Sequence, residues 1–472
     1  MFGEVIQPVS RPCLNTRTPL DIPTGKWEKG RDGSYILNGG LASVMGIVAE
    51  PNRFKTWLAV YMGLMVRAMF RKSFGLTYDA ESTFDPDRHI KQSRNDPYLS
   101  GIDFLYDGSM AFTDESAYDG TRIWKYMSSK MQGKIDDKSK QYEYETPFID
   151  PRTGKFKKAI YPTVMTIDSF SGLTPKVVED KLAKFEIGSS DLNMVAVNAA
   201  GAKSQIVKQL NGLCARSGTY FILTGLVGEK VQLDPYAPKV RQLHYLGNHM
   251  KIKDVPRNFA TLPHNMWYIH SSAPLMHKET KTPLYPKDNK HAIVGSTDLN
   301  EISLMNLRGK NGPSGFPVSM IISQSEGLKP ELSYYHLLRT NKYWGMGGNN
   351  INHFFHLYPD VTIGRTTVNA KLSTDKRMAN AAQLTSDLLQ VYQHHREDFI
   401  DVLCEPEELY KDIKDLGYDW DRLLDCRLYW CPNEEAEEQG KETLSIIDLL
   451  NMRAGKYIPW WMTKEEKEAL KY

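Results

Sequence analysis

One stretch decides how we interpret this chain: Ser43-Val44-Met45-Gly46-Ile47-Val48-Ala49-Glu50-Pro51-Asn52-Arg53-Phe54-Lys55-Thr56. It predicts an apolar strand, a polar turn and then an apolar helix over about residues 57–70. A phosphate-binding loop has this order, because backbone N–H groups surround phosphate oxygens, a lysine reaches the outer phosphates and a threonine hydroxyl binds Mg²⁺. The turn fits the spacing of G-x-x-x-x-G-K-[ST], although both glycines are replaced. The candidate nucleotide contacts are Ala49, Glu50, Pro51, Asn52, Arg53, Phe54, Lys55 and Thr56, with Thr56 also a metal ligand.

An ordinary strand, turn and helix with an exposed lysine would look similar, so the interpretation depends on other strands. Residues 74–81 predict a strand that ends near Asp79 and Glu81, and residues 163–169 predict another that ends at Asp168. A helix over about residues 199–216 leads to a further apolar strand. Strands that alternate with helices indicate a parallel sheet, and ligands of such sheets bind at the carboxyl ends of the strands.

The composition is that of a soluble globular protein. The 472 residues exceed what one hydrophobic core usually fills, and the net charge of +2 means that nucleic-acid contacts must come from local patches. Five scattered cysteines favour reduced thiols over a disulfide framework. The chain contains no run of about 18 apolar residues and no signal peptide. We therefore expect a cytoplasmic protein without membrane contact.

The segment from Glu229 to Leu262, called the basic segment below, combines cations with aromatic residues. Basic side chains follow the phosphates of single-stranded DNA, and aromatic rings stack on its bases. A solvated surface excursion is the alternative interpretation. The candidate DNA contacts are Lys230, Lys239, Arg241, Tyr245, Lys251, Lys253 and Arg257.

The two ends of the chain differ from its middle. Residues 1–38 are rich in Pro, Thr and Gly and predict an arm that leads into the core. The Gly- and Asn-rich stretch 344–351 is typical of a boundary, and a helical pattern follows it. Thr463 and Glu466 predict a capping box for a last helix. We expect an arm (1–38), an α/β core (39–345) and a mainly helical C-terminal region (346–472).

The chain resembles RecA-family recombinases, and most of all the bacteriophage UvsX-type branch. Leu37-Asn-Gly-Gly-Leu41 resembles the lead-in of that family, and its phage members also use Phe-Lys-[Ser/Thr] in the loop. Tyr78-Asp-Ala-Glu-Ser-Thr-Phe-Asp-Pro86 resembles the family stretch D-A-E-x-x-x-D-P. The resemblance implies a RecA-like P-loop ATPase core, a mostly parallel sheet flanked by helices.

The resemblance also implies roles for single residues. Glu81 falls on the glutamate that activates the hydrolytic water, and Asp85 on the aspartate that contacts adenine. Arg88 stands where the bacterial protein has a tyrosine stacked on adenine. Ile167-Asp168-Ser169, followed by Leu173-Thr-Pro-Lys176, resembles the family stretch that supports Mg²⁺ through water, a role that falls on Asp168.

Two later stretches complete the resemblance. Arg308-Gly309-Lys310 resembles the K-N-K element, which reaches across the filament interface to the ATP of the neighbouring subunit. Ser323-Gln-Ser-Glu-Gly327 resembles the Y-G-E-G turn. Thr224-Gly225 departs from the family, which has Asn-Gln or Asn-His there to sense the γ-phosphate and signal to the DNA loop.

The function implied is an ATP- and Mg²⁺-dependent recombinase that forms filaments on single-stranded DNA in the bacterial cytosol, where a phage could encode it. One alternative is a ring helicase of the DnaB kind, which needs an N-terminal helical domain, whereas only about 38 residues precede this core. The other is a non-catalytic RecA-fold protein that binds nucleotide in order to assemble.

Overall fold

The computed structural model describes residues 10–83, 85–94, 99–101, 104, 107–182, 192–230, 243–293, 295–310, 312–349, 351–438 and 442–471. Within these ranges, no helix is both long enough and apolar enough to cross a membrane. All five cysteines are buried.

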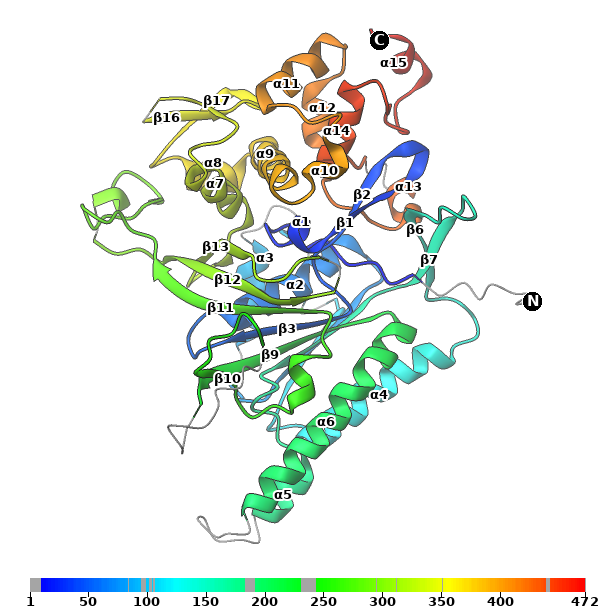
Figure 1. The fold of residues 1–472 in the computed structure, drawn as a ribbon, viewed down its shortest axis with the longest axis vertical. Coiled ribbons are helices and arrows are strands. Elements are labelled where there is room, and N and C mark those ends of the chain that lie inside the picture. The colour runs from blue at the N-terminus through cyan, green and yellow to red at the C-terminus, as the bar shows by residue number, and fades with distance from the viewer. Residues whose placement is uncertain are drawn as a thin grey trace.

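A ten-stranded sheet forms the centre of the protein, with strand order β14-β13-β12-β11-β3-β9-β8-β4-β5 and β10 paired to β9 (Figure 1). The parallel strands are β11 (Asn265–Pro274), β3 (Val44–Ala49), β9 (Thr219–Glu229), β8 (Thr163–Asp168), β4 (Phe74–Asp79) and β5 (Met110–Asp114). The antiparallel strands are β10 (Met250–Ile252), β12 (Leu299–Gly309), β13 (Pro317–Ser323) and β14 (Gly327–Leu328).

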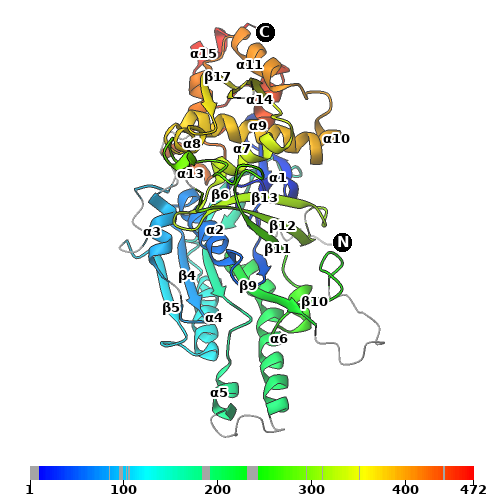
Figure 2. The same cartoon turned by 90° about the vertical axis from the view of Figure 1, so that its left-hand side faces the viewer.

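Helices cover both faces of this sheet, which explains why its central strands are apolar throughout. Met45 and Ile47 of β3 face the cluster that contains α2 (Lys55–Met69), and Val44 and Val48 face the opposite cluster. Figure 1 shows α2 and α3 (Asp87–Arg94) above the sheet and α4 (Gly120–Asp136) and α6 (Leu192–Ser217) below it. Figure 2 shows α6 extending away from the sheet beside α5 (Lys176–Leu182). The fold class expected from the sequence is confirmed.

Residues 10–38 pack between the sheet and the C-terminal helices. They form the short helix α1 (Asp21–Thr24) and a hairpin of β1 (Lys26–Lys29) and β2 (Tyr35–Asn38). Leu14 forms a β-bridge with Leu41, and the buried guanidinium of Arg17 lies 2.9 Å from the Glu331 carboxylate. A second hairpin, β6 (Glu143–Ile149) and β7 (Phe156–Ile160), lies at the same side of the molecule (Figure 1).

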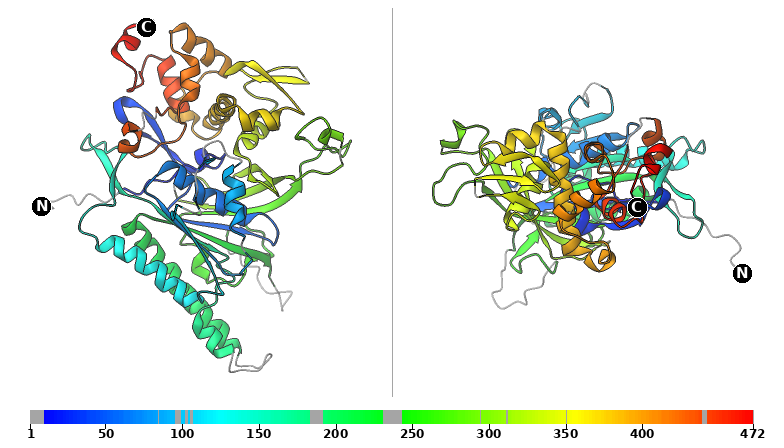
Figure 3. Two further views of the ribbon diagram at one scale, coloured as in Figure 1. Left: turned by 180° about the vertical axis from the view of Figure 1, so that it is seen from behind. Right: turned by 90° about the horizontal axis from the view of Figure 1, so that it is seen from above.

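The C-terminal region is mainly helical and surrounds α9 (Figure 3). α7 (Pro330–Thr340) shares its apolar cluster, and the Gly-rich stretch forms β15 of a small sheet. The capping box predicted at Thr463 and Glu466 is confirmed. The remaining elements are β15 (Met346–Gly348), β16 (Asn352–Phe355), β17 (Tyr358–Gly364), α8 (Val368–Thr374), α9 (Lys376–His394), α10 (Arg396–Phe399), α11 (Pro406–Asp415), α12 (Trp420–Asp425), α13 (Asn433–Glu438), α14 (Ile446–Arg453) and α15 (Lys464–Glu468).

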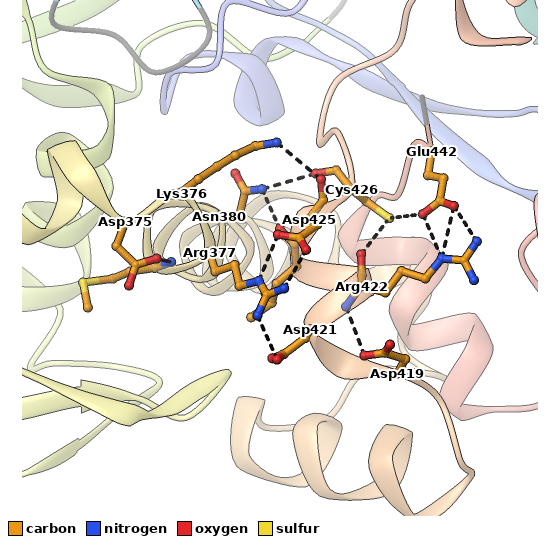
Figure 4. A network of polar contacts seen from close by, with 12 residues as sticks. Asp375, Lys376, Arg377, Asn380, Asp419, Asp421, Arg422, Asp425, Cys426 and Glu442 are labelled. Atoms are coloured by element: carbon orange, nitrogen blue, oxygen red, sulfur yellow. Dashed lines mark hydrogen bonds and ion pairs between the residues drawn. The ribbon is translucent and has the colours of Figure 1, made fainter. Parts of the chain in front are cut away.

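A polar network ties α9 to α12 (Figure 4). The Arg377 guanidinium donates to both carboxylate oxygens of Asp425, at 2.9 and 2.7 Å, and lies 2.8 Å from Asp421. The fully buried Asn380 amide donates to the backbone carbonyls of Leu424 at 2.8 Å and Cys426 at 3.2 Å. Asn380 therefore satisfies two carbonyls that water cannot reach.

Replacing Asn380 with alanine should lower the free energy of unfolding by about 2–3 kcal/mol, because it leaves two buried carbonyls without a donor. Arg377→Ala removes more exposed ion pairs and should cost less than about 1 kcal/mol. Urea unfolding of the two variants measures the difference, and equal losses would contradict the role given to Asn380.

Candidate active site

The loop after β3 takes a conformation that normally needs glycine. Asn52 and Phe54 have φ angles of 62° and 61°, in the left-handed region. This conformation costs a non-glycine residue about 1–2 kcal/mol. The Phe54 side chain packs against the buried cluster around α2, and this contact offsets part of the cost. The backbone of the loop therefore turns at the second glycine position of the motif without a glycine.

Hydrogen bonds fix the side chain of Arg53 in the loop but not that of Lys55. Arg53 donates to the carbonyl of His270, the β11 residue just after the last one that pairs with β3, and to the Glu50 carboxylate, at 2.5 and 2.6 Å. Burial, and then the Arg53 charge, lower the pKa of His270. Within the described residues, the Lys55 ammonium has no hydrogen bond or ion pair. Arg53 is fixed to the sheet, whereas the half-buried Lys55 at the start of α2 is available to a ligand.

Thr56 and Asp168 meet at the carboxyl edge of the sheet, the edge where the parallel strands end. The Thr56 hydroxyl donates to one carboxylate oxygen of Asp168, and the Thr224 hydroxyl donates to the other at 2.5 Å. β9, which carries Thr224, lies between β3 and β8. The predicted metal residues are thus in direct contact, and Thr224 completes their group.

Glu81 joins this group through Ser169, whose hydroxyl donates to the Glu81 carboxylate at 3.1 Å. The turn that carries Glu81 is shaped by Asp79, which accepts the backbone N–H groups of Glu81 at 2.9 Å and Thr83 at 2.5 Å. The Ala80 N–H donates to the Asp168 carbonyl at 2.8 Å. An exposed carboxylate is therefore positioned beside the predicted metal site.

The two predicted adenine residues lie at the start of α3. The Arg88 guanidinium is 5.9 Å from the centroid of the Trp57 ring, in the first turn of α2. Asp85 is exposed and accepts the Asp87 N–H at 2.9 Å. The structure thus brings Arg88 to the helix that follows the loop, and it leaves Asp85 at the surface nearby.

The turn that ends at Gly327 packs against the same helix. Gly327 has a φ of 90°, and a Cβ there would lie 2.1 Å from Gln92 Oε1 and 2.8 Å from the Trp57 ring. Gln92 also exchanges hydrogen bonds with the backbone of Leu328, at 2.7 and 3.0 Å. Only glycine fits this close approach of β14 to α2 and α3.

Arg308 and Lys310 lie toward the amino-terminal ends of β11 and β3, not at the end of β3 where the loop begins. Arg308 pairs with Met266 of β11, and Met266 pairs with Gly46, whereas the loop begins after Ala49. The Lys310 N–H donates to the His264 carbonyl at 3.1 Å, beside the start of β3. Burial, and then Lys310, Arg11 and Arg308, lower the pKa of His264 to about 4. These cations therefore belong to the opposite edge of the sheet.

The described residues of the basic segment include regular structure. They contain β10, which pairs with β9, and the short helix η2 (Arg257–Ala260). Lys251, Lys253, Arg257 and Tyr245 are exposed, and the Lys230 ammonium donates to the Asn248 carbonyl at 3.1 Å. The predicted DNA contacts Lys239 and Arg241 lie outside the described residues.

The site residues fit a nucleotide with Mg²⁺. The adjoining oxygen donors of Thr56 and Asp168 are of the kind that Mg²⁺ prefers, and Mg²⁺ usually takes further ligands from phosphates and water. No group of three His, Cys, Asp or Glu side chains in the described part of the chain could hold a metal alone. The first turn of α2 has no side-chain cap, so its N–H groups can meet a phosphate.

Sequence reasoning missed two residues of this site. Thr224 was interpreted only as a departure from the family, and Asp79 was not assigned a role. Asp79 ends β4 and pairs with Asp168, and Thr224 directly follows Leu223, the last β9 residue that pairs with β8, so their positions beside Asp168 were the signal that could have identified them.

Comparisons with known proteins add little to this geometry. No family model matches the chain, and no curated protein matches it. Among solved structures, the chain is similar to the crystal structure of the RadB recombinase, with 13% sequence identity, a TM-score of 0.34, and coverage of 61% of this chain and 91% of the other. This similarity carries no argument about activity, and the likeness to the bacteriophage branch stays a prediction.

Proposed function

We propose that this protein is an ATP-dependent recombinase that assembles on single-stranded DNA and hydrolyses ATP between neighbouring subunits, in support of homologous pairing and strand exchange. The contact of Thr56 with Asp168, beside Glu81 and at the end of central parallel strands, carries the proposal. It unites a loop lysine and threonine, a metal carboxylate and a candidate base at one edge of the sheet.

Each residue has a distinct part in the proposed reaction. Lys55 and the first N–H groups of α2 would bind the phosphates, and Thr56 and Asp168 would hold Mg²⁺. The metal, when bound, supplies positive charge that offsets the charge of the phosphates. Glu81 accepts a proton from the attacking water, while Ser169 orients its carboxylate. Arg88 and Trp57 lie beside the loop, where an adenine ring can stack.

The position of Arg308 and Lys310 supports an assembled enzyme. Cations at the amino edge of the sheet do not reach the loop at the carboxyl edge of the same chain. In a head-to-tail assembly each subunit presents one edge to its neighbour, so cations of one subunit can serve the loop of the next. The exposed cations of the basic segment supply contacts to the phosphates of DNA.

One observation favours a second candidate function, that of a non-catalytic protein which binds nucleotide in order to assemble. Phe54 occupies the second glycine position of the loop, so the loop makes its turn without the flexible glycine of the motif. Binding without turnover would distinguish this candidate from the recombinase.

Replacing Lys55 with alanine should weaken nucleotide binding at least tenfold, because a charge-assisted hydrogen bond contributes about 1.5–3 kcal/mol. The measurement is a titration with fluorescent ATP. Lys138→Ala is the matched control, since it removes an exposed lysine far along the chain with the same change of charge. An unchanged affinity for Lys55→Ala would show that the loop assignment is wrong.

Negative-stain microscopy with single-stranded DNA and a non-hydrolysable ATP analogue tests the assembly. We expect helical filaments from the wild-type protein. Closed rings would favour the helicase alternative, and single particles that bind the analogue would contradict the proposed assembly.

A further inference from the structure

Ser171 joins the site to the basic segment. It lies in the Asp168 loop, which we define as residues 168–173. The Ser171 hydroxyl accepts the Leu226 N–H and donates to the Lys253 carbonyl, both at 2.9 Å. Leu226 follows Thr224 on β9, and its carbonyl accepts the Lys253 N–H at 2.7 Å. One hydroxyl thus touches β9 and the chain just after β10.

Lys203 of α6 forms hydrogen bonds with both chain segments at this junction. Its ammonium donates to the Ser171 carbonyl at 2.8 Å and to the Asp254 carbonyl at 2.9 Å, and the residue is only 5% exposed. Burial lowers the pKa of Lys203 to about 8, although the charges of Asp254 and Glu115 act in the opposite direction. A buried lysine whose ammonium joins carbonyls of two loops is a structural tie, since few lysines are buried without a specific partner.

Two further contacts bind the Asp168 loop to the basic segment. The Phe170 and Phe259 rings stack with centroids 5.4 Å apart and an interplanar angle of 9°. The Lys203 ammonium lies 5.8 Å from the centroid of the Phe170 ring. Ring stacking therefore joins the Asp168 loop to residues 250–259 in addition to the hydrogen bonds.

The other end of the Asp168 loop reaches the metal residues. Asp168 binds the Thr56 and Thr224 hydroxyls, and the Phe170 N–H donates to the Thr224 carbonyl at 2.9 Å. Gly225 has no side chain with which to contact a ligand, and a Cβ there would lie 3.2 Å from Val48 and 3.4 Å from Ile252. The connection between the two sites passes through backbone and Ser171, not through a polar side chain at position 225.

We propose that Lys203 and Ser171 are positioning residues that couple nucleotide binding at Lys55, Thr56 and Asp168 to single-stranded DNA binding by the described part of the basic segment that carries Lys251, Lys253 and Arg257. The inference rests on the proposed function and deepens it. A shift of Asp168 on nucleotide binding displaces its loop, and the tie transmits this displacement to residues 251–254. Coupling of this kind is reciprocal, so DNA must raise nucleotide affinity by the same factor by which nucleotide raises DNA affinity.

Lys203→Met tests the proposal, because methionine keeps an unbranched apolar stem and removes the ammonium. Lys208→Met is the matched control, since it makes the same change at an exposed position of the same helix. The measurement is the affinity for a fluorescent oligothymidylate, by anisotropy at fixed salt, with and without a non-hydrolysable ATP analogue. The affinity for the analogue is measured with and without DNA.

In the wild type and in Lys208→Met, the analogue should raise DNA affinity at least about fivefold. In Lys203→Met this factor should fall below about twofold, while each affinity measured alone stays within about threefold of wild type. Lys203→Arg, which can still donate to both carbonyls, should restore part of the coupling. Circular dichroism and thermal unfolding verify that the variants are folded.

The outcomes separate this inference from the proposed function. Wild-type coupling in Lys203→Met, or independent binding of the two ligands to the wild type, would overturn the positioning role and leave the recombinase proposal standing. A wild-type protein that binds neither ligand would overturn the proposed function, and the inference with it.

Discussion

Glu81→Gln should lower ATP turnover of the assembled protein by about 10²–10⁴-fold, the usual contribution of a general base. Glutamine keeps the size of the side chain and can still accept the Ser169 hydroxyl, which lies 3.1 Å from the Glu81 carboxylate. It cannot accept a proton from water. The Asp79 contacts that shape the turn involve the backbone N–H of residue 81 and remain. ATP affinity should therefore change by no more than a few-fold.

The measurement is steady-state phosphate release with saturating single-stranded DNA, together with a binding titration for ATP. Glu145→Gln is the control, since it neutralises an exposed glutamate outside the site. Retained turnover in Glu81→Gln would remove Glu81 from the mechanism. A loss of ATP binding together with turnover would show that the Glu81 side chain contributes to nucleotide binding and not to the hydrolysis step.

Local patterns in the sequence were sufficient for several of the parallel strands of the sheet. The strands before the loop, before Glu81 and before Asp168 are short apolar runs bounded by polar residues, and they form β3, β4 and β8. Burial on both faces produces such runs whatever the neighbouring strand is. The carboxyl ends of parallel strands share one edge of the sheet, which explains why Thr56, Glu81 and Asp168 lie close together.

Other features depend on contacts between distant residues, which local patterns do not encode. Leu307 to Gly309 end β12, whose strand character comes from pairing with β11 and β13. The basic segment contains β10 because β9 continues beyond Thr224 and offers it an edge. The burial of Lys203 depends on two loops brought together by the fold, and no pattern in α6 marks that lysine.

Arg308→Ala should bind ATP normally as a free subunit and should hydrolyse it about 10³–10⁵-fold more slowly in the assembled state, the range attributed to an arginine supplied by a neighbour. The physical reason is geometric. Arg308 lies beside Met266 at the amino edge of the sheet, and the loop after Ala49 lies at the carboxyl edge. The guanidinium can therefore stabilise charge on the terminal phosphate only of an adjoining subunit. Turnover per subunit should rise steeply with protein concentration or with DNA.

Mixing variants gives the decisive measurement. Arg308→Ala has an intact loop, and Lys55→Ala has an intact arginine. A head-to-tail interface is therefore complete where the loop of an Arg308→Ala subunit meets Arg308 of a Lys55→Ala subunit. Random co-assembly of equal amounts should restore up to about a quarter of wild-type turnover, because one interface in four has that pairing. Glu81→Gln mixed with Lys55→Ala is the matched control: both defects lie at the carboxyl edge, so no mixed interface is complete and turnover should stay absent. If the Arg308→Ala mixture also stays inactive while microscopy shows joint filaments, Arg308 does not act between subunits and the protein hydrolyses ATP within single chains.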